Sequence, residues 1–201
     1  MERYVDALQE IGNIGIGNAA TALADILRTK INVTVPRATF VPIEEVFTVV
    51  RKVEDLVVAV VLRVEGGIYG TILFVFPEAS ALELVVQLLG TTYDTIQEID
   101  EMGQSVLMEV GNVLAGSFLN AISAMTQLTF IPAVPMLAFD MLGSVISGAL
   151  SGSGMVEDQV LLIETVLFEE GYTVAGDFFL FFDPGSLAAL LRALGLDGQT
   201  V

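Results

Sequence analysis

The chain has 201 residues, of which 54% are apolar, and it carries 25 acidic and 8 basic residues with no histidine, cysteine or tryptophan. This composition excludes disulfides, zinc sites built from Cys or His, the Ser-His-Asp triad and a cysteine nucleophile. The net charge of −17 makes nucleic acid an unfavourable partner, because binding phosphates requires Lys and Arg. Any enzyme chemistry therefore falls to carboxylates, amides, hydroxyls and backbone groups.

The predicted elements follow the same order twice along the chain. Apolar spacing and turn residues predict helices at about 2–28, 78–90, 98–126 and 184–194. Strands and a hairpin with a short Gly turn follow each long helix, and a Pro is expected in the first turn of each shorter helix. The run Val57–Leu62 does not alternate with polar residues, so both sheet faces should be covered.

A shift of 99 residues aligns the two halves of the chain. Between residues 2 and 18 it gives six identities, and Val35-Pro36 falls on Val134-Pro135. We therefore predict one α+β domain over residues 1–201, built as a pseudo-two-fold duplication of about 1–95 and 96–201. Its sheet should be mainly antiparallel and flanked by two long motif-bearing helices and by shorter helices.

The high mean hydropathy of +0.74 raises the question of a membrane. The 30 residues between Glu109 and Asp140 carry no charge, which is long enough to span a bilayer. However, this stretch holds many amides, hydroxyls and two prolines, and no basic cluster flanks it. The charged N-terminus is also unlike a signal peptide. We expect a cytoplasmic protein without membrane insertion, and a membrane-associated protein is the alternative.

One polar pattern occurs in both halves at the same spacing. It is Asp6-x-x-x-Glu10-x-x-Asn13 in the first and Ser105-x-x-x-Glu109-x-x-Asn112 in the second. On a helix these spacings place each trio within a sector of about 60°, away from most of the apolar residues. A glycine precedes each asparagine and another follows it four residues later. These glycines suit close approach either of a partner or of the protein's own neighbouring element.

The repeated pattern resembles the signature of the CheC/CheX/FliY phosphatase family of bacterial and archaeal chemotaxis. The strings EIGNIGIGN (residues 10–18) and EVGNVLAGS (residues 109–117) are close to the CheC form. The resemblance continues through VPIEEV, FDM and EDQVLLIETVL (residues 41–46, 139–141 and 157–167). Two intact copies favour the CheC form over CheX, which has one, and the absence of a following switch-protein domain argues against FliY.

The resemblance implies a hydrolase that removes the aspartyl phosphate of the response regulator CheY. Asn13 and Asn112 would each hold the attacking water in line with phosphorus. Glu10 and Glu109 would pair with a lysine of CheY, while Asp6 and Ser105 would support docking or helix geometry. The protein would need no metal or cofactor of its own, because phosphorylated CheY carries the Mg²⁺.

The family also implies a second partner, the receptor-modifying deamidase CheD. Its expected site is a short helix after the strand that contains Asp140-Met141, where Val145 and Ile146 belong to an apolar stripe. The Gly- and Ser-rich stretch 143–154 has no evident counterpart in the first half, which favours a partner surface. The stripe could equally pack on the protein's own core. A non-catalytic adaptor of the same family that binds CheD is the alternative function.

Overall fold

The computed structural model describes residues 2–27, 32–49, 52–153, 156–169 and 172–196. The first half contains α1 (Glu2–Leu27), β1 (Asn32–Pro42), the 3-10 turn η1 (Ile43–Glu45), α2 (Val46–Val49), β2 (Leu56–Gly66), β3 (Gly70–Pro77) and α3 (Glu78–Leu89). The second contains the 3-10 turn η2 (Ile96–Glu98), α4 (Glu101–Thr126), β4 (Phe130–Pro132), β5 (Met136–Met141), α5 (Leu142–Ser153), β6 (Gln159–Glu169), β7 (Tyr172–Phe182) and α6 (Ser186–Ala193).

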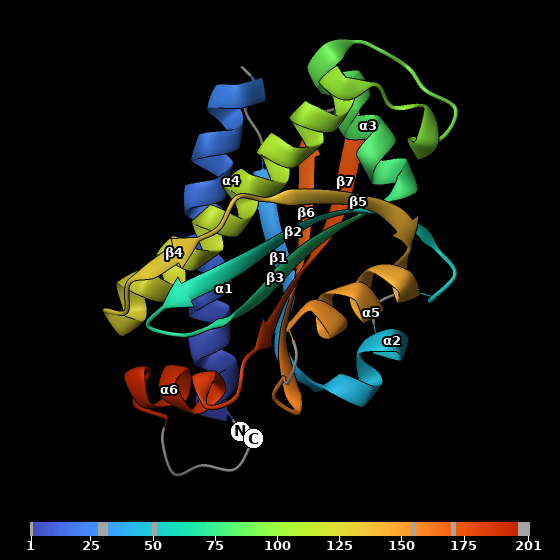
Figure 1. Cartoon of the computed structure of the whole chain (residues 1–201). Helices are drawn as coiled ribbons and strands as arrows, with labels where there is room; N and C mark the ends of the chain where they lie inside the picture. Colours follow the sequence, from blue (N-terminus) through green and yellow to red (C-terminus); the bar gives the residue numbers. More distant parts are fainter. Residues whose placement is uncertain (1, 28–31, 50–51, 154–155, 170–171, 197–201) are drawn as a thin grey trace.

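The strands form a single curled sheet in the order β1-β6-β7-β3-β2-β4, with β5 also pairing with β2 (Figure 1). Every described pair is antiparallel. The predicted α+β class with a mainly antiparallel sheet is therefore confirmed. Exchanging β1 with β5, β2 with β6 and β3 with β7 leaves the pairings among these six strands unchanged. This is the arrangement that a duplicated chain would produce.

The repeated Val-Pro step interrupts an outer strand in each half. In β1 the register with β6 shifts between Thr34 and Arg37, across the first Val-Pro. In the second half the same step separates β4 from β5. Proline has no N–H to donate to a strand ladder, which accounts for a break at this place in both strands.

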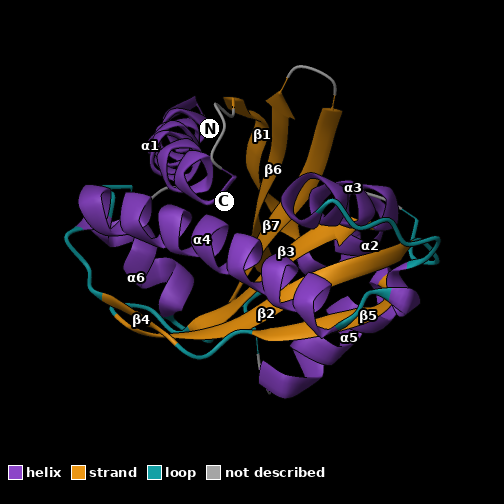
Figure 2. Ribbon diagram, turned by 90° about the horizontal axis from the view of Figure 1, so that it is seen from above, coloured by secondary structure: helices purple, strands orange, loops and turns teal. Residues whose placement is uncertain are grey.

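Helices cover both faces of the sheet, which explains the non-alternating apolar strands. The cluster on one face joins residues of α1, α3, α4 and α6 to alternate strand residues such as Val58, Val60 and Phe74. The cluster on the other face joins α2 and α5 to the intervening residues, such as Val57 and Val75. Figure 2 shows α4 with α1 on one side of the sheet and α5 on the other.

The ends of the elements differ from the sequence expectation at the prolines. Pro77 is the N-cap residue of α3 rather than a first-turn residue. After Pro184 the chain makes a turn through Gly185 at φ 85°, so α6 begins only at Ser186. The predicted helix from 98 is divided, since η2 ends before Asp100 and α4 starts after it.

The stretch expected to lack a counterpart, 143–154, forms most of α5 as far as it is described. The first half has η1 and α2 at the equivalent place, between an outer strand and a hairpin, and both α2 and α5 pack against the second face of the sheet. The expectation of no counterpart was therefore wrong, since the first half has a shorter helix there.

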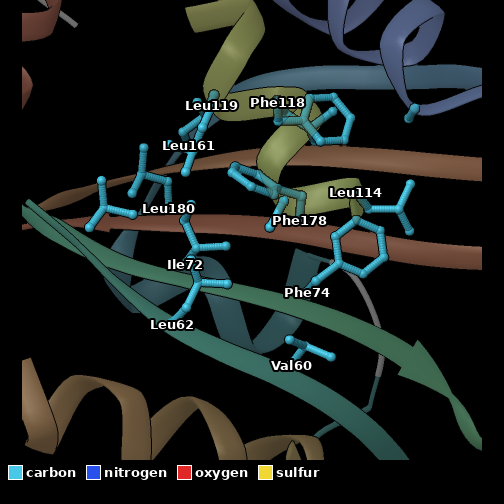
Figure 3. Close-up of a cluster of buried hydrophobic side chains, with 14 of the residues drawn as sticks. Val60, Leu62, Ile72, Phe74, Leu114, Phe118, Leu119, Leu161, Phe178 and Leu180 are labelled. Atoms are coloured by element: carbon cyan, nitrogen blue, oxygen red, sulfur yellow. The ribbon is translucent and has the colours of Figure 1, made fainter. Parts of the chain in front are cut away.

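The long apolar helix α4 is a core helix in this structure. Among the described residues it is the one helix long and apolar enough to cross a membrane, with a mean hydropathy of 1.3 over its most apolar 18 residues. However, 56% of that window is buried inside the protein. Figure 3 shows Leu114, Phe118 and Leu119 of α4 directed into the cluster formed with the sheet. Burial thus accounts for the apolar residues without a bilayer.

Candidate functional site

The first polar motif lies on the exposed side of α1. Glu10 and Asn13 are exposed, while Ile11 between them is fully buried. The side chain of Asp6 lies outside the described part of the structure, although its backbone belongs to α1. The spacing of three residues, close to one helical turn, therefore presents a carboxylate and an amide together to solvent.

The second motif lies on α4 and presents the same groups. Ser105 and Glu109 are exposed and Asn112 is half-buried, while Val110 is fully buried. The two motif helices pack against each other on the same side of the sheet (Figures 1 and 2). The structure thus brings each glutamate together with its asparagine on one helix face, as predicted from the spacing.

The glycine before each asparagine faces the protein's own sheet. A Cβ on Gly12 would lie 3.2 Å from Cγ1 of Val35 in β1, and one on Gly111 would overlap Cγ2 of Val60 in β2. Each of these glycines therefore lets a motif helix lie close to a strand at the residue before the asparagine. Of the two possibilities left open by the sequence, the protein's own neighbouring element is the correct one here.

A third close approach joins the two motif helices. A Cβ on Gly15 of α1 would lie 2.6 Å from Cδ1 of Phe118, a fully buried ring on α4. Phe118 also packs on Phe178 of β7, with ring centroids 5.1 Å apart. The ring therefore holds α1, α4 and the sheet together, close to both motifs.

The glycines four residues after the asparagines have a different environment. A Cβ on Gly17 or on Gly116 would meet nothing within 4 Å. Gly116 borders a hollow of about 240 Å³ between α4 and β4, which Asn120 and Phe130 also line. These two positions therefore leave room for an approaching surface one helical turn beyond each asparagine.

The N-terminus of the second motif helix is capped by Asp100. Its Oδ1 accepts a hydrogen bond of 2.9 Å from the N–H of Gly103, and this bond holds the pKa of the Asp100 carboxyl below its usual value. The cap fixes where α4 begins and hence which residues share its exposed face. No group of three or more potential Asp or Glu metal ligands occurs among the described residues.

The residues expected to bind CheD divide into two groups. Asp140 and Met141 are exposed at the end of β5. In contrast, Val145 is 7% exposed and Ile146 is fully buried, both packed in the core cluster on the second face of the sheet. The expectation that these two residues form a partner surface is corrected, because their stripe covers the sheet and leaves Ser144 and Ser147 exposed.

A groove of about 380 Å³ runs between this helix and the sheet. It is lined by Val61, Arg63, Thr71, Met136, Ala138, Phe139, Asp140, Ser144, Val145, Gly148 and Ala149. Arg63 is tied to Asp183 by hydrogen bonds of 3.0 and 2.6 Å, which raise the pKa of its guanidinium. The sequence did not predict that Arg63 and Gly148 line this groove. The only feature that singled out Arg63 was that no other Lys or Arg follows it before Arg192.

Comparison with known proteins gives a relative over nearly the full chain. The sequence profile of the CheC-like family matches residues 5–39 and 102–137, the segments that hold the two motifs. The protein named CheY-P phosphatase CheC from Bacillus subtilis is 33% identical over 198 residues, covering 96% of this chain and 95% of that protein.

Solved structures share the fold at lower identity. The crystal structure of Thermotoga maritima FliY has a TM-score of 0.75 at 22% identity and covers 96% of both chains. A chain of the CheX-CheY-BeF3-Mg+2 complex from Borrelia burgdorferi has a TM-score of 0.52 at 19% identity, covering 86% of this chain and 98% of that chain. These two matches show the shared fold. The 33% identity to the Bacillus protein over nearly the whole chain, with the match to the family profile, shows that the chain belongs to the CheC-like family.

Proposed function

We propose that this protein is a phosphatase that hydrolyses the aspartyl phosphate of a CheY-type response regulator. The observation that carries the proposal is the pair of Glu-Asn motifs, each on the outer face of a helix held against the sheet. The relative that is 33% identical over nearly the full chain is named a CheY-P phosphatase. The composition leaves carboxylates, amides, hydroxyls and backbone groups for such a site, and each motif offers a carboxylate and an amide.

The proposed chemistry needs little from the protein beyond positioning. An aspartyl phosphate is an activated acyl phosphate, and the regulator supplies the Mg²⁺ that balances its charge. Asn13 or Asn112 would orient a water whose oxygen attacks phosphorus, while the bond from phosphorus to the aspartate oxygen breaks. Inorganic phosphate and the regulator's free carboxylate are the products. An amide can hold this water without changing its protonation state.

Glu10 and Glu109 have a separate role in the proposal. Each is exposed one helical turn before its asparagine, so a cation on the regulator could pair with it while the amide reaches the phosphate. A carboxylate one helical turn from the asparagine also repels a phosphate that binds beside the glutamate instead of beside the amide. Ser105, and Asp6 at the corresponding position of the first motif, would support docking or helix geometry at the edge of the same contact.

The direct experiment is phosphate release from the regulator. The purified regulator is charged with acetyl phosphate and Mg²⁺, and its phosphate loss is followed with and without substoichiometric protein. Multiple turnovers support a phosphatase. No acceleration, with or without CheD, contradicts it and favours the alternative, a non-catalytic adaptor that binds CheD.

The two sites are expected to be active but unequal. The first opens with Asp6 and the second with the neutral Ser105, and one ion pair at a protein surface is worth about 0.2–1 kcal/mol. Asn13→Ala and Asn112→Ala should therefore leave residual turnover rates that differ by about 1.4- to 5-fold. Steady-state rates of the two single variants measure this difference, and equal losses would contradict it.

We further propose that CheD docks over the groove beside α5. The groove offers the exposed carboxylate of Asp140 at its edge and the open Gly148 on the helix, where a Cβ would meet nothing within 4 Å. Val145 and Ile146 would then contribute by holding α5 on the sheet rather than by touching the partner.

Asp140→Lys should weaken CheD binding by about fivefold or more, since it reverses the charge at the edge of the groove. The side chain is exposed, so the fold should tolerate the change. Isothermal titration with purified CheD measures the affinity. Asp94→Lys makes the same change in net charge at an exposed residue that does not line the groove. Equal affinities of both variants and the unaltered protein would remove this proposal.

The remaining proposals concern organisation and location. The exchange symmetry of the sheet and the repeated Val-Pro break support a single domain formed by duplication, with the two copies meeting near residue 95. Burial of α4 supports a protein without membrane insertion, and the proposed location is the cytoplasm. Fractionation without detergent would recover such a protein in the supernatant, whereas a membrane-associated one would sediment.

A further inference from the structure

The second motif alone is too small to hold a protein partner. Residues 105 to 112 span about 10 Å of helix, whereas a stable interface buries about 800 Å² on each partner. This inference rests on the function proposed above. Given that function, the regulator must contact residues beyond Ser105, Glu109 and Asn112. The exposed face of α4 shows which residues these are.

Met102 extends that face towards the N-terminus of α4. At about 100° per residue it falls within a sector of about 80° that also holds Ser105, Glu109 and Asn112. Its side chain is 63% exposed, and it is the one large exposed hydrophobic residue on a helix in the described part of the chain. A flexible thioether set beside polar groups is suited to act as an apolar anchor.

Gly116 extends the same face in the other direction. It lies about 6 Å along the helix from Asn112, at the edge of the 240 Å³ hollow between α4 and β4. Nothing lies within 4 Å of a Cβ built there, and Gly116 is half-buried rather than covered. The hollow therefore offers space for a partner side chain next to the amide.

We propose that the regulator's docking surface on α4 runs from Met102 to Gly116, with Met102 as its apolar anchor. This anchor belongs to the second site alone, because the aligned residue of the first half is Arg3. Met102 contacts the partner's surface and not the reacting phosphate. Its loss is therefore expected to raise KM and to leave kcat unchanged.

The experiment measures the second site in the Asn13→Ala background. Met102→Glu should raise KM for the phosphorylated regulator about tenfold, and Gly116→Trp should raise it at least as much by filling the space beside the hollow. Met102→Leu should keep KM within about twofold, since leucine retains an apolar side chain of similar size. Tyr69→Glu, which changes a half-exposed aromatic in the β2–β3 turn, is the matched control and should leave KM unchanged.

Affinity for the regulator loaded with beryllofluoride and Mg²⁺ gives a second readout, and thermal unfolding shows whether each variant is folded. The dissociation constant should rise with KM for Met102→Glu and Gly116→Trp only. An unchanged KM for either folded variant would overturn the inference. A parent protein that neither turns over nor binds the loaded regulator would instead overturn the proposed function.

Discussion

Replacing both Asn13 and Asn112 with alanine is expected to reduce turnover of phosphorylated regulator by a factor of about 10²–10³. Removal of one well-placed polar group at a reacting centre typically costs this much, and the double variant leaves no amide at either site. The remaining rate should approach the regulator's own phosphate loss. The measurement is phosphate release under multiple-turnover conditions with Mg²⁺.

The fold should survive this double substitution. Asn13 is exposed and Asn112 half-buried, and alanine is a better helix former than asparagine. The thermal unfolding midpoint is therefore expected to stay the same or to rise slightly. Gln87→Ala is a suitable control, because it removes an exposed amide of α3 that belongs to neither motif. Wild-type turnover in the double variant would contradict the role given to the asparagines.

Phe118→Ala is expected to destabilise the fold by about 3–5 kcal/mol. The ring is fully buried, packs on Phe178 at 5.1 Å and occupies the space that Gly15 leaves on α1. Figure 3 shows the ring of Phe118 beside that of Phe178. Alanine would leave a cavity there, where α1, α4 and the sheet meet. For a domain of this size the unfolding midpoint should fall by about 10 °C.

Urea unfolding gives the free energy of this change. Ile131→Ala removes an apolar side chain that is 62% exposed, so its free energy of unfolding should stay within about 0.5 kcal/mol of the unaltered protein. A loss below about 1 kcal/mol in Phe118→Ala would mean that the ring does not hold the two motif helices together.

Much of the architecture could be predicted because it depends on the local spacing of apolar and turn residues. The starts of α1 and α3, the two hairpins and the apolar strands covered on both faces follow from periodicity, glycine turns and residue type. The spacing of Glu10 with Asn13, and of Glu109 with Asn112, likewise determined that each pair shares a helix face. The exact start of α6 did not follow, because the turn at Pro184 and Gly185 delays the helix.

What a helix face meets could not be read from the chain. Gly12 and Gly17 are both glycines of α1, yet Gly12 lies against Val35 while a Cβ on Gly17 would meet nothing within 4 Å. In the same way Val145 and Ile146 form an apolar stripe that covers the sheet rather than a partner. Periodicity states which residues lie together, but their neighbours come from distant parts of the chain.

The sequence by itself therefore determined the doubled Glu-Asn pattern, the helices that bear it and the α+β class. Only the tertiary structure decided that Phe118 joins α1 to α4, that Met102 extends the exposed face of the second motif, and that Arg63 is tied to Asp183 beside a groove. The reason is physical. Local spacing depends on neighbours within about a turn of helix, whereas burial and contact depend on pairs far apart in the chain, such as Arg63 and Asp183, which are 120 residues apart.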